Sequence, residues 1–389
     1  MKGRKLLMIP GPIEFEPEVL AAMSVPTPSH VAPNFIESFG RSLEMLREVW
    51  LSPGGQPFII AGTGTLAMDM AGCNLIEAGD KALVISSGYF GDRFANLLKR
   101  YGAEVDMLEA TTGEVVSMER IENAISSKDY KLLTFTHVDT STGVRIDPKA
   151  IGALGVKYNT LTVLDGVCSV AAEEIRQEEW GLDIVLTASQ KAVAVPPGLA
   201  LLVASQRAME VWKNRKTPVS NYYADWANWL PIMQAYEARK PSYFGTPAVN
   251  LVIALEVSLK QILAEGMDAR FDRHQKIADA FRAAMQALNI KPLAIRPEIA
   301  ANSLTAAYYP EGVDGAKFRA AIVQAGVIVA GGLLGEIKSE YFRVGHMGAV
   351  NQNDLLATVG AIESALEVCG YKHESSAGSR AAKQVMMAV

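Results

Sequence analysis

The feature that most constrains the fold of this chain is a series of short apolar segments in which polar and apolar residues do not alternate. Five of them lie at residues 82–87, 132–137, 161–165, 183–189 and 199–205. Strands that are buried on both faces of a parallel sheet have this pattern. Helix-like segments at residues 92–101 and 117–126 separate some of these strands. The succession predicts an α/β fold with a mostly parallel central sheet flanked by helices.

After about residue 250 the pattern changes, and a smaller α+β part is expected. Residues 251–263 are a helix candidate, and apolar residues recur at helical spacing from Met267 to Leu288. Strand candidates follow at residues 303–309, 327–331 and 341–346, and a closing helix at 355–368. A chain of 389 residues exceeds what one hydrophobic core usually supports. We therefore predict an N-terminal segment at 1–20 that contributes to the active site, a large domain at 21–255, a small C-terminal domain at 256–372 and a frayed tail at 373–389.

Charge and hydropathy argue against several classes of partner. The formal net charge is −5 and neither end carries a basic block, whereas nucleic acids bind clusters of Lys and Arg. The apolar stretch before Pro10 is too short for a signal peptide. The longest apolar stretch, at residues 192–204, contains two prolines and is shorter than the roughly 18 residues of a membrane span. We expect a cytoplasmic protein that binds neither nucleic acid nor membranes, and its terminal "MAV" is not a peroxisomal signal.

Cysteine and histidine spacing gives no support for a metal site. Cys73, Cys168 and Cys369 lie far apart and form no CxxC motif, which is typical of reduced thiols. The five histidines include no HxxxH pair. We expect no metal ion in this protein.

Three features lie at strand ends of the large domain, where open α/β sheets bind ligands. Gly62, Thr63, Gly64 and Thr65 precede a helix, whose free amides and dipole favour a phosphate, although a glycine turn that only starts a helix has the same pattern. Asp165 ends a buried strand, where it either meets a cation or caps the next segment. Lys191 is the only charged residue between Asp183 and Arg207, and it either carries out chemistry or extends to the surface.

Taken together, the three features are the parts needed to bind pyridoxal 5'-phosphate. The glycine turn would hold the phosphate, and Lys191 supplies the amine that a Schiff base with the aldehyde requires. The Asp165 carboxylate would keep the pyridinium nitrogen protonated, so that the ring can accept electrons from a carbanion. The combination predicts a pyridoxal-phosphate enzyme.

At these residues the sequence resembles the class V aminotransferases of fold type I. The resemblance rests on "ASQKA" with "LDGVCS" before it, on "THVDTSTGV" at 136–144 and on "MIPGPI" at 8–13. With "SYFGTP" and "FRVGHMG", it is nearest to the alanine–glyoxylate and serine–pyruvate aminotransferases. It implies the pyridoxal-phosphate transferase fold and ping-pong transfer of an amino group from a small amino acid, alanine or possibly serine, to a small 2-oxo acid, glyoxylate or pyruvate.

The resemblance also implies a role for each matching residue. Lys191 would bind the cofactor and move a proton, and Asp165 would pair with the ring nitrogen. Val167 and Phe90 would cover the two ring faces, and Thr140, with Ser141 as the alternative, would reach the ring hydroxyl. Gln190 and residues Thr63 to Thr65 would hold the phosphate, joined by Tyr243 and Thr246 from the second subunit of a homodimer.

The substrate carboxylate is expected at Arg343, which lies within the apolar segment "YFRVGH". An unpaired guanidinium is costly there, and its planar fork fits a carboxylate, although a structural ion pair is the alternative. A backbone amide of the segment "PGP", such as that of Gly11, would reach the same carboxylate. No second arginine is assigned to a distal carboxylate, which disfavours dicarboxylic substrates.

Two alternatives stay open at this point. A cysteine desulfurase or another lyase of the same fold usually has histidine before the lysine and on the ring, where this chain has Gln190 and Phe90. A nicotinamide-dependent dehydrogenase could use Gly62 to Gly64 as its dinucleotide loop, but the next strand ends in serines and glycine instead of the expected acidic residue.

Overall fold

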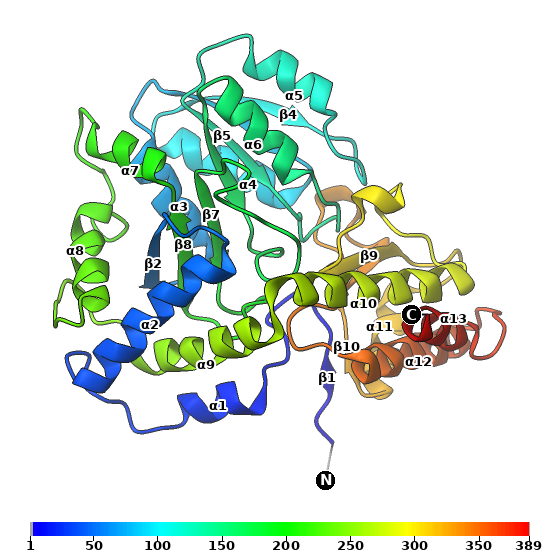
Figure 1. Cartoon of the computed structure of the whole chain (residues 1–389). Helices are drawn as coiled ribbons and strands as arrows, with labels where there is room; N and C mark the ends of the chain where they lie inside the picture. Colours follow the sequence, from blue (N-terminus) through cyan, green and yellow to red (C-terminus); the bar gives the residue numbers. More distant parts are fainter. Residues whose placement is uncertain (1–2, 389) are drawn as a thin grey trace.

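The computed structural model describes residues 3–388 of the chain, and a seven-stranded sheet forms its centre (Figure 1). The strands lie in the order β2-β8-β7-β6-β5-β3-β4. Their bounds are β2 Gln56–Ala61, β3 Lys81–Ser86, β4 Glu104–Glu109, β5 Leu132–Thr136, β6 Leu161–Asp165, β7 Ile184–Ala188 and β8 Leu199–Ala204. Strands β5 to β8 are buried at every residue, as their continuous apolar sequences require. The predicted mostly parallel, helix-flanked sheet is confirmed.

Helices cover both faces of this sheet (Figure 1). Their bounds are α1 Pro17–Met23, α2 Pro33–Val49, α3 Gly64–Leu75, α4 Tyr89–Arg100, α5 Met118–Ile125, α6 Pro148–Lys157, α7 Gln206–Lys213, α8 Trp226–Glu237 and α9 Val249–Glu265. Local signals set several of their starts. For α6, the Asp147 side chain accepts hydrogen bonds from the amides of Lys149 and Ala150, and Pro148 occupies the first helical position.

A second, smaller part follows and has its own sheet and core. Its elements are α10 Met267–Ala287, η1 Pro297–Ile299, β9 Leu304–Tyr308, α11 Gly315–Gln324, β10 Val327–Ile328, β11 Ala330–Gly331, η2 Gly335–Ile337, β12 Tyr341–Gly345, α12 Gln352–Val368 and α13 Ala377–Met387. The antiparallel order is β11-β12-β9, and β1 (Leu6–Leu7) pairs in parallel with β10. One apolar cluster fills the large part and another fills the small one. The boundaries of the four segments drawn from the sequence stay a prediction.

Strand β8 differs from the expected orientation, since it runs antiparallel to both of its neighbours, β7 and β2. Only residues 189–198 connect β7 to β8, and a parallel connection needs a crossover of about a dozen residues or more. Because β8 is antiparallel to both neighbours, β2 and β7 point the same way. Ala61 and Ala188, their last residues, pair with the adjacent residues Leu199 and Ala200.

The C-terminal segment, expected to be frayed, instead contains the helix α13. It packs against α10 and α12, with Gly378 and Ala382 buried. The small side chains let the helix approach closely: a Cβ added to Gly378 would lie 2.8 Å from a methyl carbon of Leu288. The Glu363 carboxylate accepts a hydrogen bond from the Gly378 amide. In this segment tertiary packing outweighs a composition that by itself suggests little order.

No helix in the described part of the chain is long and apolar enough to cross a membrane. The expected cytoplasmic location stays a prediction.

Ala382→Glu is expected to destabilise the protein, because the substitution places an unpaired carboxylate in the buried face of α13. The expected loss is about 3 kcal/mol of unfolding free energy. Gln384→Glu, two residues away on the exposed side of the same helix, is the matched control. Thermal unfolding of the two variants checks the prediction, and equal melting temperatures would mean that α13 does not dock.

Candidate functional site

Five loops meet at one edge of the central sheet because their strands point the same way. Strands β3, β5, β6 and β7 are parallel to one another, and β2 has the same direction as β7. The carboxyl ends of these strands lead to the residues predicted for the site, which are Gly62 to Thr65, Phe90, Thr140, Asp165 with Val167, and Gln190 with Lys191. This edge is where ligands bind in open α/β sheets.

Lys191 lies in a tight loop between β7 and β8 that backbone and hydroxyl groups hold in place. The Ser189 hydroxyl donates to the carbonyl of Pro196 (2.9 Å) and accepts from the amide of Leu199 (3.2 Å). The Lys191 carbonyl accepts from the amide of Ala194 at 2.7 Å. No carboxylate of the described residues forms an ion pair with the half-buried Lys191 ammonium, which donates to the carbonyl of Pro10.

The N-terminal segment 8–13 passes directly over Lys191. A Cβ added to Gly11 would lie 2.5 Å from Cδ and 2.7 Å from Nζ of Lys191, and its φ of +118° also favours glycine. At the start of this segment, the carbonyl of Met8 accepts a hydrogen bond from the amide of Gly345 (2.9 Å), the last residue of β12. The segment therefore connects the lysine loop with the small sheet.

Asp165 is buried at the end of β6, with 1 % of its surface exposed. Its Oδ1 accepts a hydrogen bond from the amide of Val167 at 3.1 Å. Burial is the main cause that raises the pKa of Asp165 to about 7, and the nearby Asp139 carboxylate raises it further. The charge of Lys191 lowers the pKa of Asp165. A cation beside this carboxylate would relieve the cost of its burial.

The residues predicted to hold a phosphate form a close arrangement at the start of α3. A Cβ on Gly64 would lie 2.8 Å from Cγ2 of Val167, so only glycine fits between the helix start and this valine, two residues after Asp165. The Thr63 side chain makes no capping hydrogen bond with the helix. The side-chain oxygen Oε1 of Gln190 is buried and has no hydrogen-bond partner among the described residues. Free helix amides of this kind bind anions.

Asp139, which the sequence analysis did not single out, organises the loops after β3 and β5. Its carboxylate accepts from the amide of Phe90 (3.0 Å) and from the amide (2.8 Å) and hydroxyl (2.5 Å) of Ser141. Ser141 is thereby engaged, whereas the hydroxyl of Thr140 lies 2.7 Å from Sγ of Cys168. The Phe90 backbone and the Thr140 side chain are thus both held by hydrogen bonds to other loops of this edge.

Arg93 is a second residue that the sequence analysis did not assign. Its guanidinium carbon lies 5.0 Å from the centre of the Phe90 ring, and its Nη1 donates to the hydroxyl of Thr65 at 3.3 Å. In the described part of the chain no carboxylate pairs with it. The spacing Phe90-x-x-Arg93 at a helix start places both side chains on one face, a signal that the sequence offered.

Arg343 lies in the middle of β12, opposite Ala306 of β9. Its Nε donates to the carbonyl of Gly331 (2.8 Å) and its Nη1 to the carbonyl of Thr140 (3.1 Å). Burial lowers the pKa of Arg343. Among the described residues it has no ion pair, so the structural ion pair considered as its alternative role is absent.

Tyr243 and Thr246 lie apart from this group, on an exposed segment between α8 and α9. The Tyr243 side chain is 63 % exposed, and its ring centre lies 5.3 Å from that of His30. The structure of one chain does not bring them to Lys191. Their predicted role in the partner subunit's site stays a prediction.

The cysteines do not form the arrangement that a desulfurase needs. Cys73 and Cys168 are buried, and burial raises the pKa of the Cys73 thiol. Cys369 is half-buried at the end of α12. No group of three or more His, Cys, Asp and Glu residues in the described part of the chain is arranged to bind a metal ion.

Comparisons with known proteins give a consistent result. Residues 58–339 match the family Aminotransferase class-V. The chain is 40 % identical over 368 residues to the alanine–glyoxylate aminotransferase 1 of Saccharomyces cerevisiae, covering 90 % of this chain and 94 % of the relative. It is 31 % identical to the L-aspartate–glyoxylate aminotransferase of Paracoccus denitrificans, covering 99 % and 96 %. The crystal structure of ureidoglycine–glyoxylate aminotransferase from Bacillus subtilis superposes with a TM-score of 0.93, at 27 % identity, over 100 % of this chain and 99 % of that one.

Asp165→Asn is expected to change how stability depends on pH in protein freed of bound small molecules. The folded chain holds a proton on Asp165 up to about pH 7, whereas the unfolded chain loses it near pH 3.8. Wild-type stability therefore falls as the pH rises through this window, by about 4 kcal/mol at most. The variant lacks this loss, so its advantage grows from pH 4 to pH 7.

Urea unfolding at several pH values checks this prediction. Glu311→Gln removes an exposed carboxylate and is the control. If Asp165→Asn shows the same pH dependence as wild type, Asp165 is already ionised in the folded chain near pH 4.

Proposed function

Because this chain belongs to the class V aminotransferases, we propose that it transfers the amino group of a small amino acid to glyoxylate, with pyridoxal 5'-phosphate as its cofactor. One observation carries the proposal: the Lys191 amine and the buried Asp165 carboxylate lie at neighbouring strand ends, beside a strand that presents the Arg343 guanidinium. These groups suit an aldehyde, a pyridinium and a carboxylate.

The chain's residues fit this cofactor at each of its polar groups. The raised pKa of Asp165, about 7, indicates a carboxylate that a ring cation would stabilise. The uncapped start of α3 provides free amide donors for a phosphate, and the side-chain NH2 of Gln190 would add a further donor. Gly64 and Val167 are in contact range, so the residues proposed for the phosphate and the residue proposed for one ring face form one continuous surface. When bound, the cofactor supplies the aldehyde that takes up the amino group and the ring that accepts electrons.

The protein's own groups would then position the substrate and move protons. The Lys191 amine would hold the cofactor. As a general base and acid, it would also move a proton between Cα of the substrate and the aldehyde carbon of the cofactor. Arg343 would bind the substrate carboxylate with its two-pronged guanidinium, helped by the Gly11 amide. Phe90 would stack on the ring face opposite Val167, and Thr140 would meet the ring hydroxyl. The buried surroundings of Asp165 and the segment 8–13 would exclude water.

For the amino donor we propose alanine first and serine second. The relative from S. cerevisiae supports alanine at 40 % identity, whereas the relative from P. denitrificans acts on aspartate at 31 %. In this chain Arg93 donates to the hydroxyl of Thr65, one of the residues proposed for the phosphate, and lies over the Phe90 ring, so we assign it to the cofactor and not to a distal substrate carboxylate. We therefore retain small donors over dicarboxylic ones.

We also propose that two copies of the chain share their active sites. The exposed Tyr243 and Thr246 have no role in their own chain's site, and class V resemblance assigns them to the phosphate of the partner's site. The desulfurase alternative lacks a suitably placed cysteine, and the dehydrogenase alternative lacks an acidic residue at the end of β3, where Ser86 lies. Neither is favoured by the family match.

Lys191→Ala is expected to reduce alanine–glyoxylate transamination by about 100- to 10,000-fold, because the proton carrier is lost. Borohydride reduction of the wild type should attach the cofactor to the peptide that contains Lys191, as mass spectrometry would show. Lys99→Ala, on the exposed side of α4, is the control and should keep wild-type activity. Full turnover by Lys191→Ala would rule out the assignment.

Arg343→Gln is expected to raise the half-saturation concentration for alanine by about 100-fold, since the half-buried charge partner of the carboxylate is removed. Half-reactions of the wild type with alanine, serine, glutamate and aspartate, followed by cofactor absorbance, should run fastest with alanine and then serine. Arg100→Gln, an exposed residue of α4, is the control. An unchanged half-saturation in Arg343→Gln would mean that another group binds the carboxylate.

A further inference from the structure

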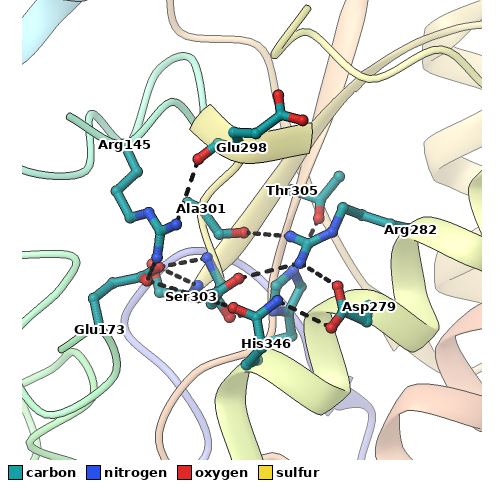
Figure 2. A network of polar contacts seen from close by, with 11 residues as sticks. Arg145, Glu173, Asp279, Arg282, Glu298, Ala301, Ser303, Thr305 and His346 are labelled. Carbon is teal, nitrogen blue, oxygen red and sulfur yellow. Dashed lines mark hydrogen bonds and ion pairs between the residues drawn. The ribbon is translucent and has the colours of Figure 1, made fainter. Parts of the chain in front are cut away.

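A buried polar network outside the proposed site joins the two parts of the molecule (Figure 2). At its centre is Glu173, whose side chain has no exposed surface. Glu173 follows Asp165 and Val167 through a compact turn, in which the Ser169 amide donates to the Gly166 carbonyl (3.0 Å) and the Glu173 amide to the Ser169 carbonyl (2.8 Å). The carboxylate is thus fixed relative to the residues beneath the proposed cofactor ring.

The partners of the Glu173 carboxylate come mainly from the segment that leads into β9. It accepts hydrogen bonds from the amides of Asn302 and Ser303 (3.1 Å for Ser303) and from the side-chain amide of Asn302 (3.0 Å). Within residues 3–388 its charged partner is Arg145, which pairs with it at 2.9 Å and is 31 % exposed. A buried carboxylate is tolerated only when its oxygens are satisfied in this way.

The same segment is connected to the strand that carries Arg343. The carbonyls of Asn302 and Ser303 accept from Nδ1 and from the amide of His346, both at 3.0 Å. His346 directly follows β12, and β12 pairs with β9 from Tyr341 to Gly345. Figure 2 shows Glu173, Ser303 and His346 in one cluster of contacts. Glu173 is therefore two hydrogen-bonded steps from the β-strand of Arg343.

We propose that Glu173 is a positioning residue for substrate carboxylate binding, which it achieves by holding the Arg343 strand at a fixed place relative to Asp165 and Val167. This inference rests on the proposed aminotransferase function. It assigns Glu173 no contact with substrate or cofactor, since its oxygens are occupied by Asn302, Ser303 and Arg145. Its effect is confined to the distance between Arg343 in the small part of the molecule and Asp165 with Val167 in the large part.

Glu173→Gln tests the proposal because it keeps the side-chain size but replaces one acceptor oxygen with a donor. That nitrogen faces amide donors, so the segment 302–303 should shift. A misplacement of about 1 Å costs up to about 100-fold, and we expect the half-saturation concentration for alanine in the half-reaction to rise by about 10- to 100-fold. The dissociation constant of pyridoxal phosphate and the cofactor absorbance should stay within about twofold of wild type.

Glu174→Gln is the matched control, since the neighbouring Glu174 is exposed and pairs only with Arg176 among the described residues. It should leave all these quantities unchanged. If Glu173→Gln weakens cofactor binding as much as alanine binding, Glu173 has a general structural role and the proposal is overturned. Should this variant fail to fold, Arg145→Gln removes the partly exposed charged partner of Glu173 instead. It should raise the half-saturation concentration for alanine and leave the dissociation constant of pyridoxal phosphate unchanged. An unchanged half-saturation concentration would overturn the proposal.

A double-mutant cycle with Arg343→Lys distinguishes action through Arg343 from an independent effect. If Glu173 acts through Arg343, the effect of Glu173→Gln on alanine binding should be smaller in the Arg343→Lys background. Fully additive effects would contradict the proposal. Failure of the proposed function itself has another signature, because then wild type would show no absorbance change with any amino acid.

Discussion

The pairing of β8 between β2 and β7 determines where the site lies. Because β8 is antiparallel to both neighbours, the ends of β2 and β7 meet at adjacent residues of β8, Leu199 and Ala200. One end leads to the helix start at Gly62 to Thr65 and the other to Lys191. Two loops that are more than a hundred residues apart in sequence therefore begin side by side, one with the residues proposed for the phosphate and the other with Lys191. All other parts of the proposed site are added around this pair.

Much of the large domain could be predicted from the sequence because buried parallel strands leave continuous apolar runs. Asp165 and Lys191 stand out since each interrupts or ends such a run. Two strands were not predicted: β2 contains Pro57, and β4 is an edge strand with charged residues at both ends. Such strands lack a clear pattern, because an edge strand needs only partial burial. The orientation of β8 depends on the length of the connection from β7, and the pattern of apolar residues within a strand gives no information about it.

Part of the candidate site could be predicted from the sequence, where a residue type is unusual at its position and needs a chemical explanation. Arg343 was accessible because an arginine within an apolar strand requires a partner. Asp139 and Glu173 were not, because their partners are other loops: Glu173 binds Asn302, which is 129 positions away. Contacts of this kind follow from tertiary packing and leave no local pattern.

The N-terminal segment has a consequence for the order in which the molecule can be completed. Leu6 and Leu7 pair with β10, and the Met8 carbonyl receives the amide of Gly345, yet both partners lie near the other end of the chain. A ribosome makes residues 6–8 long before these partners. The large sheet has all of its strands by residue 204, so it can form while synthesis continues. The segment 8–13, which passes over Lys191, can take its place only after residues 327–345 have been made, so the lysine loop is completed later than the sheet that carries it.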